Sequence, residues 1–291
     1  MAKAKFHFLD DYRNLVRDLL ARYPRAEAMS RAVGGSYDAL GEVEKQLLIQ
    51  CGLAPDHTLL DVGCGSGRLA KALVPYLGQG TFLGTDVVRE LLDYAAEGCP
   101  GHWKFAQVDD IRIPFPTDAA DFACFFSVFT HLLHEETYCY LLEAKRVVKP
   151  GGRIVFSFLE FEHNWPIFEA TYKTIAGGAS NVHLNTFIGR DAIEAWSRHL
   201  GLSIVEIHAA TDPFIALSRP IVYDDGQRVE GMAALGQSVC VLSNDKPASP
   251  ALAQSKWNVT SPYRVTYVTT TRSASQRIRT QFEGPAQSGS D

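Results

Sequence analysis

The feature that most constrains the fold of this chain is the stretch from Leu59 to Ala70, which reads LLDVGCGSGRLA. An apolar run closes near Asp61, glycines follow at 63, 65 and 67, and an amphipathic segment comes next. This order predicts a strand, a tight turn and a helix. Glycine permits a sharp turn and lets a ligand approach the main chain, and the start of a helix directs N–H groups at that ligand. We therefore predict a nucleotide-cofactor site at this turn.

Two carboxylates narrow the choice of ligand. Asp61 would repel a pyrophosphate and attract a ligand that carries an ammonium group. The next predicted strand ends at Asp86, nineteen residues after Gly67, which is about the spacing at which an acid binds a ribose diol in βαβ nucleotide sites. The glycine spacing is Gly-x-Gly-x-Gly, whereas the dinucleotide-binding fingerprint has Gly-x-Gly-x-x-Gly.

The segment DVGCGSG at 61–67 resembles the first motif of the class I, Rossmann-like methyltransferases that depend on S-adenosylmethionine. Later segments are similar to later motifs of that family in the same order, and they are 109–115, 121–127 and 143–152. The resemblance covers 57–159 continuously. It implies an α/β fold with a doubly wound, seven-stranded, mostly parallel sheet in the order 3-2-1-4-5-7-6, in which strand 7 is antiparallel.

The resemblance also implies roles around S-adenosyl-L-methionine, which becomes S-adenosyl-L-homocysteine after transfer. The glycine turn and Asp61 would hold the methionine moiety, Asp86 the ribose and Asp109 the adenine. The cofactor-binding residues that we predict are Asp61, Gly63, Cys64, Gly65, Ser66, Gly67, Asp86, Val87, Asp109, Asp110, Ile111 and Ser127.

We divide the chain into three parts. They are an N-terminal helical cap (1–52), a methyltransferase domain (53–243) that includes an acceptor-site insertion (164–190), and a partly disordered C-terminal extension (244–291). Predicted helices include 9–22 and 38–51. Predicted strands after the second are 103–108, 122–127, 153–159, 203–208 and 237–242. In the extension, 263–268 alternates enough for an edge strand or a partner contact, although a disordered tail is the simpler interpretation.

Candidate catalytic residues follow the fourth and fifth strands. His131 is our leading candidate for a general base, because an imidazole with a pKa near ~6.5 can remove a proton from a hydroxyl during transfer. The alternative is that it packs against the cofactor or caps the next helix. Glu162 and His163 are weaker candidates that could position a hydroxyl, or they are solvated loop residues. No residue spacing is diagnostic of a metal site, and we predict none.

Composition limits the partners. The net charge is −5 and the isoelectric point about 6.0, so no global basic field recruits nucleic acid. No apolar run approaches the ~20 residues of a membrane span, and the N-terminus lacks the core of a signal peptide, which predicts a cytoplasmic protein. The oligomeric state cannot be predicted.

We predict a methyltransferase that O-methylates a small molecule, a sugar, or a glycan or natural-product precursor. The aromatic insertion suits such a partly apolar or sugar-like acceptor. The alternatives are N-methylation of a small amine, a nicotinamide-dependent oxidoreductase, and a non-catalytic binding protein on the same fold.

Overall fold

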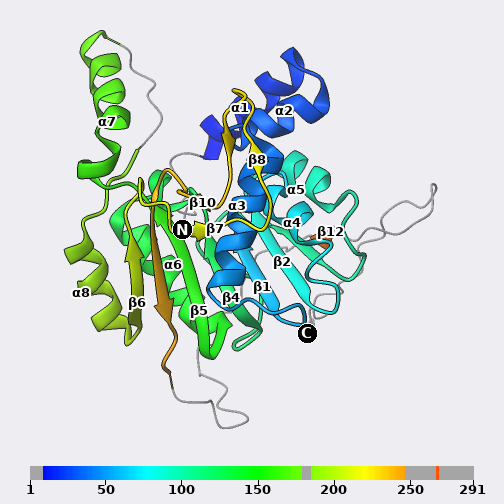
Figure 1. Cartoon of the computed structure of the whole chain (residues 1–291), viewed down its shortest axis with the longest axis vertical. Coiled ribbons are helices and arrows are strands. Elements are labelled where there is room, and N and C mark those ends of the chain that lie inside the picture. The colour runs from blue at the N-terminus through cyan, green and yellow to red at the C-terminus, as the bar shows by residue number, and fades with distance from the viewer. Residues whose placement is uncertain (1–8, 179–184, 247–266, 269–291) are drawn as a thin grey trace, which may run out of the picture.

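Buried apolar runs form the central sheet of the computed structural model, which describes residues 9–178, 185–246 and 267–268. The strands of this sheet are β1 (Thr58–Val62), β2 (Thr81–Asp86), β3 (Lys104–Gln107), β4 (Ala120–Phe125), β5 (Val148–Phe158), β6 (Ser203–His208), β11 (Ser238–Ser243) and β12 (Tyr267–Val268). Their order is β12-β3-β2-β1-β4-β5-β11-β6 (Figure 1).

The topology confirms the predicted sheet. Strands β3, β2, β1, β4 and β5 pair in parallel, and β11, the predicted seventh strand, runs antiparallel to both β5 and β6. An eighth strand, β12, adds antiparallel to the edge strand β3. It is part of the stretch for which a disordered tail was the simpler interpretation. The rest of the predicted extension after Lys246 lies outside the described residues.

Helices cover both faces of the sheet (Figure 1). The helices of the described residues are α1 (Leu9–Arg22), α2 (Arg25–Ala32), α3 (Tyr37–Gln50), α4 (Arg68–Leu73), α5 (Arg89–Ala96), the 3-10 turn η1 (Phe129–His131), α6 (His134–Val147), α7 (Phe161–Ala176) and α8 (Arg190–Leu200). Helix α7 projects away from the sheet (Figure 1). Helix α2 was not predicted. In the parts of the chain that the structure describes, no helix is both long and apolar enough to cross a membrane.

Two further differences from prediction lie after β5 and β6. Glu162 and His163 are in the first turn of α7 and not in a loop, and Asn164 kinks this helix with φ −118° and ψ 23°. Pro166 is tolerated because it follows the kink in a first helical turn, where its missing N–H has no helical acceptor. The irregular stretch after β6 contains two short hairpins, β7 (Ile215–Ala216) with β10 (Met232–Ala233) and β8 (Ile221–Val222) with β9 (Arg228–Val229).

Alternate residues of the central strands pack on opposite faces of the sheet. Leu60 and Val62 belong to one buried cluster, while Leu59 belongs to the other. Both faces are therefore apolar, as expected for a parallel sheet between two helical layers.

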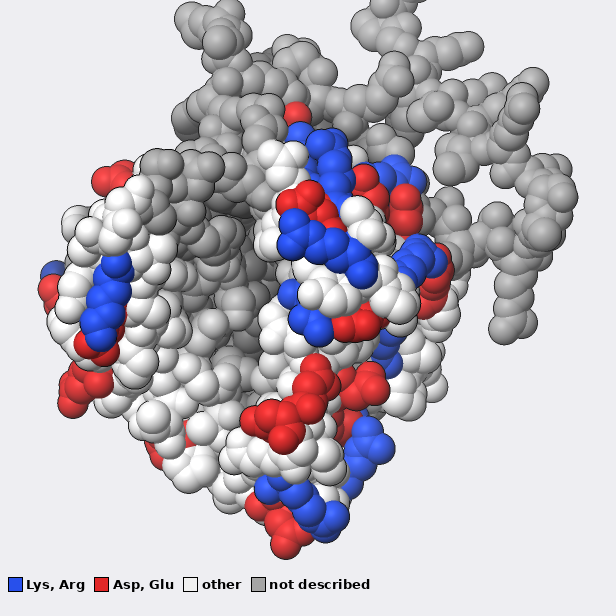
Figure 2. Space-filling model, turned by 90° about the horizontal axis from the view of Figure 1, so that it is seen from above, with Lys and Arg blue, Asp and Glu red and all other residues white. Residues whose placement is uncertain are grey.

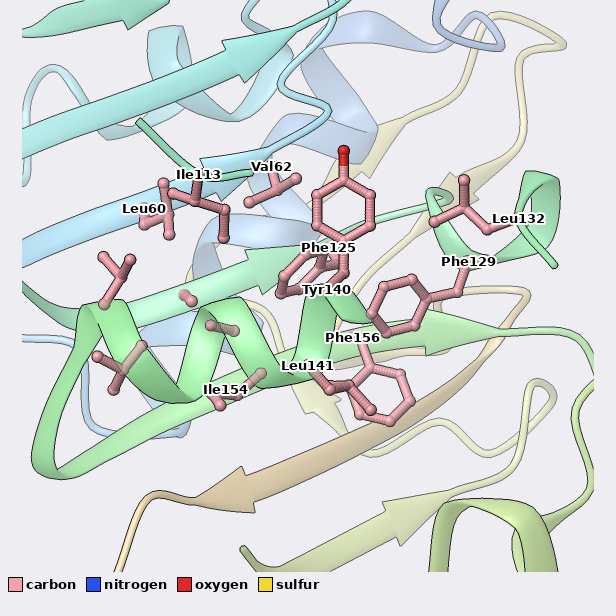
Figure 3. Close-up of a cluster of buried hydrophobic side chains, with 14 of the residues drawn as sticks. Leu60, Val62, Ile113, Phe125, Phe129, Leu132, Tyr140, Leu141, Ile154 and Phe156 are labelled. Atoms are coloured by element: carbon pink, nitrogen blue, oxygen red, sulfur yellow. The ribbon is translucent and has the colours of Figure 1, made fainter. Parts of the chain in front are cut away.

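Aromatic rings fix the segment that follows β4. Figure 3 shows Phe129 of η1 beside Phe125 of β4 and Phe156 of β5. Its ring centroid lies 4.8 Å from that of Phe125 and 5.0 Å from that of Phe156. Because Phe129 is fully buried, η1 is anchored to the sheet next to the strand ends.

Candidate functional site

A cavity of about 410 Å³ lies at the carboxyl ends of β1, β2 and β4. Its sheet side includes Asp61, the glycine turn, Asp86 and the segment from Phe126 to Val128. Its other side comes from α1, the end of α2 and α3. This is the edge where open α/β sheets bind ligands, and the volume suits a small molecule.

The glycine turn takes backbone conformations that other residues rarely adopt. Gly65 has φ 53° and Gly67 has φ 81°. A Cβ at Gly67 would lie 2.6 Å from the Cβ of Ala95 in α5, and a Cβ at Gly65 would lie 2.5 Å from Val33. Glycine is therefore required here both for backbone conformation and for packing.

Asp61 lies on the floor of the cavity with little access to water. The residue is 4% exposed, and the thiol of Cys124 donates to its Oδ1 at 3.5 Å. Burial, and then the nearby charge of Glu44, raise the pKa of Asp61 to about 8. A cationic ligand group would stabilise the ionised form of this carboxyl.

Asp86 ties β2 to the glycine turn. The N–H of Gly65 donates to one carboxylate oxygen and the N–H of Val88 to the other, each at 2.9 Å. Burial raises the pKa of Asp86 to about 6, and these N–H donors oppose the shift. The carboxylate is thus held at the mouth of the turn.

The N-terminal helices bind directly to the glycine turn. Arg68 forms a buried ion pair with Glu44 of α3, and its Nη1 donates to the carbonyl of Val33 at 2.8 Å. The Tyr37 hydroxyl donates to the carbonyl of Ser66 at 2.6 Å, and the Ser66 hydroxyl donates to the carbonyl of Met29 in α2 at 2.9 Å. These contacts place the cap over the cavity.

Charge in the cavity favours a ligand that is positive overall. The side chains that line it include the carboxylates of Glu44, Asp61 and Asp86 and the guanidinium groups of Arg31 and Arg68. When Asp61 is ionised, carboxylates outnumber guanidinium groups by one. S-adenosylmethionine, with a sulfonium, an ammonium and a carboxylate, has the complementary net charge.

Most of the predicted cofactor residues meet in this cavity. Those that line it are Asp61, Gly63, Cys64, Gly65, Asp86, Val87 and Ser127, together with the candidate base His131. Ser66 and Gly67 do not line the cavity; they pack the turn against α2 and α5.

Of the three acids that we predict around the cofactor, Asp61 and Asp86 line the cavity and Asp109 does not. Asp109 is exposed and does not line the cavity, because β3 ends at Gln107 and the residue that reaches the cavity is Val108. Asp110 accepts a hydrogen bond from the N–H of Arg112 at 3.0 Å, and neither it nor Ile111 lines the cavity. A contact of these residues with adenine stays a prediction.

The weaker catalytic candidates lie outside the cavity. Glu162 and His163 belong to the start of α7, and the His163 imidazole lies 3.9 Å from the carboxylate of Glu160. Glu160 also pairs with Arg190, so its charge is already compensated.

Sequence reasoning missed the cap residues of the site and the arginine that pairs with one of them. Tyr12, Glu44 and Arg68 line the cavity. A signal existed for Arg68, which directly follows the glycine turn, and for Glu44, a charge on the apolar side of a predicted helix. Their pairing across 24 residues could not be found without the fold.

Comparison with known proteins identifies part of the chain. Residues 60–156 match a family model described as a methyltransferase domain. The ubiquinone/menaquinone biosynthesis C-methyltransferase of Cupriavidus taiwanensis is 32% identical over 129 residues, which is 43% of this chain and 51% of that protein. The malonyl-[acyl-carrier protein] O-methyltransferase of Serratia marcescens is 34% identical over 146 residues, or 49% of this chain and 55% of that protein. The chain thus spans about half the length of these curated relatives.

Solved structures agree on the fold. The magnesium protoporphyrin IX methyltransferase from Synechocystis PCC 6803, solved with bound S-adenosylhomocysteine, has a TM-score of 0.53 at 15% identity and covers 80% of this chain and 96% of its own. That identity supports the fold alone. Together with the sheet order and the glycine turn, the comparisons confirm the predicted family and its cofactor type. Residues 60–156 thus match the methyltransferase domain family, and the sheet that contains them has the strand order of the class I methyltransferase fold.

Proposed function

We propose that this chain transfers a methyl group from S-adenosylmethionine to an oxygen of a small molecule, such as a sugar or a glycan or natural-product precursor. The observation that carries the proposal is the cavity in which Asp61 and Asp86 face one space beside the glycine turn. The curated relatives are named as C- and O-methyltransferases, so the choice of oxygen rests on the residues around the acceptor side.

The residues of the cavity fit the cofactor. Asp61 would pair with its ammonium group, Asp86 would accept the ribose hydroxyls, and the bare main chain at Gly65 would allow close approach. When bound, S-adenosylmethionine supplies an electrophilic methyl group on a sulfonium. The N-terminal helices then contribute by covering the cavity and excluding water, and the rigid strand ends contribute by alignment.

His131 is the residue that we propose as general base. It ends η1, lines the cavity, and is held in place because Phe129 anchors this turn in the core. Its imidazole would take the proton from an acceptor hydroxyl as the oxygen attacks the methyl group. An amine acceptor that is already neutral would not need this step.

Aromatic side chains on α7 offer a surface for the rest of the acceptor. Phe168 contacts the rings of Phe161, Trp165 and Tyr172, with ring centroids 5.0 to 6.1 Å apart. Phe161 also stacks on Phe187 at 4.5 Å. Trp165 is 49% exposed and Tyr172 44%, an unusual exposure for side chains of this size.

This aromatic surface is connected to the cavity wall. The N–H of Thr186 donates to the carbonyl of Thr130, next to His131, at 2.8 Å, and His134 hydrogen-bonds the carbonyl of Phe187 at 3.1 Å. Figure 2 shows a hollow between the lobe that contains α7 and the lobe of α1 and α2. We propose that an apolar or ring-bearing part of the acceptor lies along α7, with Glu162 and His163 as further polar contacts.

Calorimetry and methyl transfer test the proposal. S-adenosylhomocysteine is expected to bind and NAD is not; binding of NAD alone would instead support a nicotinamide-dependent oxidoreductase. S-adenosylmethionine with a labelled methyl group is then incubated with the protein and a library of hydroxylated small molecules. The library contains small alcohols, sugars, and glycan or natural-product precursors. If the cofactor binds but no labelled product forms with any of them, a non-catalytic binding protein would be favoured.

The role of His131 is tested in the same assay. His131→Ala is expected to lower the transfer rate about a hundredfold or more, in the range usual for loss of a general base. His199→Ala removes an exposed histidine of α8 and is the control, with a rate unchanged. Labelled product at an undiminished rate in the His131 variant would reject the base and keep the methyltransferase.

A further inference from the structure

Ser127 has a backbone conformation that a serine does not adopt by preference. Its φ is 58°, and among the described residues only two other non-glycine residues, Ser36 and Asp118, have positive φ. Of these three, Ser127 is the residue that lines the cofactor cavity. A left-handed backbone is unfavourable for a residue with a Cβ, so neighbouring groups must hold it in place.

The holding groups come from three adjacent strand ends. The N–H of Ser127 donates to Oγ of Ser157 in β5 at 2.8 Å, and the Ser157 hydroxyl donates to Oε1 of Gln237 at 2.7 Å. Gln237 precedes β11, and its Nε2 donates to Oγ of Ser127 at 3.0 Å, which closes a ring of three hydrogen bonds. Thr130 adds a bond from its hydroxyl to the carbonyl of Ser127 at 3.0 Å.

The conformation of Ser127 determines where the next residues lie. The chain turns at this residue from β4 into η1, and this turn places Val128 against the glycine turn. A Cβ on Gly63 would be 2.6 Å from Cγ2 of Val128, so the two segments are in close contact. If Ser127 relaxed, Val128 and His131 would move relative to the cofactor-binding turn.

We propose that Gln237 is a positioning residue that keeps Ser127 left-handed and so sets the wall of the cofactor cavity formed by Ser127, Val128 and His131. Gln237 is itself outside the set of side chains that line the cavity. It acts through Ser127 and Ser157, across 110 residues of sequence. The inference rests on the proposed cofactor site and adds a residue that no motif of the sequence indicates.

A binding cycle with S-adenosylhomocysteine as the probe tests this role. Gln237→Met keeps the side-chain length and removes both hydrogen bonds, and it is expected to raise the Kd about tenfold because part of the binding energy must restore the strained turn. Glycine adopts positive φ without a Cβ penalty. In a Ser127→Gly background, Gln237→Met is therefore expected to change the Kd by less than about twofold.

Two further variants separate positioning from general loss of stability. Ser157→Ala removes the acceptor of the Ser127 N–H. It is expected to raise the Kd as Gln237→Met does when residue 127 is serine, and to leave the Kd nearly unchanged in the Ser127→Gly background. Gln50→Met is the matched control: the Gln50 amide also makes two hydrogen bonds, with Phe214 and Ala216, but it lies away from the cavity. Its Kd is expected to stay within about twofold of the unaltered chain, although its melting temperature falls.

Several results would overturn the inference. They are an unchanged Kd in Gln237→Met, an equal rise in Kd with serine and with glycine at 127, or a similar rise in the Gln50 control. Each of these leaves the proposed function standing, because the unaltered chain still binds the probe. Failure of the unaltered chain to bind S-adenosylhomocysteine would overturn the proposed function and this inference with it.

Discussion

Asp61 shows how one residue can couple cofactor binding to pH. Its carboxyl is buried, and its pKa is raised to about 8, so the ligand-free protein keeps a proton on it at neutral pH. A ligand with an ammonium group prefers the ionised carboxylate. Binding near pH 7 should therefore release a proton.

We expect the affinity for S-adenosylmethionine to increase about tenfold from pH 6.5 to pH 8, as Asp61 ionises more readily. Asp86, with a pKa near 6, is already mostly ionised over this range. Calorimetry in buffers of different ionisation enthalpy measures both the Kd and the released proton. Asp61→Asn should bind S-adenosylmethionine more weakly at pH 8, and the pH dependence of its Kd should reflect only the titration of the ligand. If this variant kept the pH dependence of the unaltered chain, Asp61 would not be the titrating group.

The raised pKa of Asp61 also predicts how the stability of the ligand-free protein changes with pH. Because the folded-state pKa of Asp61 lies above its unfolded value, its contribution to stability is present below about pH 4 and is lost as the pH rises through about 8. Without ligand, Asp61→Asn should melt at a higher temperature than the unaltered chain at pH 8, and the difference should shrink toward pH 5. Thermal unfolding at several pH values checks this, and a pH-independent difference would refute it.

At the scale of elements, the glycine turn joins β1 to α4 while α5 packs against it. The Cβ and Cα of Ala95 lie 2.6 and 2.7 Å from the position of a Cβ on Gly67, whose φ is 81°. Any other residue would meet both a strained backbone and a rigid helix.

We expect Gly67→Ala to lower the free energy of unfolding by about 2–4 kcal/mol, from left-handed strain and overpacking together. Gly78→Ala is the control, since Gly78 is exposed, has an ordinary φ and has no atom within 4 Å of the added Cβ. Its effect should be within about 0.5 kcal/mol of zero. Urea unfolding compares the two, and equal effects would mean that the turn tolerates a side chain.

At the scale of the whole molecule, the cap and the sheet share a buried ion pair. The side chain of Glu44 in α3 is 3% exposed and that of Arg68, which follows the glycine turn, is 12% exposed. Burial raises the pKa of Glu44, and the guanidinium of Arg68 opposes that shift. The pair therefore joins the two parts of the chain that enclose the cavity.

We expect Arg68→Met to cost about 3–5 kcal/mol of unfolding free energy, because it leaves the Glu44 charge buried beside Asp61. Adding Glu44→Gln should recover part of this loss. Arg25→Met, which breaks the half-exposed pair with Glu97, is the control and should cost less than about 1 kcal/mol. Denaturant titrations give the three values, and a small cost for Arg68→Met would show that this pair does not hold the cap.

The sequence by itself determined the strands, their order and the cofactor turn, because these depend on local periodicity, on glycine spacing and on a family pattern that runs along the chain. It also determined that Asp61 and Asp86 come close together, since parallel strands end at one edge. Tertiary structure alone decided the rest. It ended β3 two residues before Asp109 and brought Val108 to the cavity instead, it paired Glu44 with Arg68, and it joined Ser127 to Gln237. The physical reason is that side-chain contacts between distant segments depend on how the layers pack, and no local pattern encodes that packing.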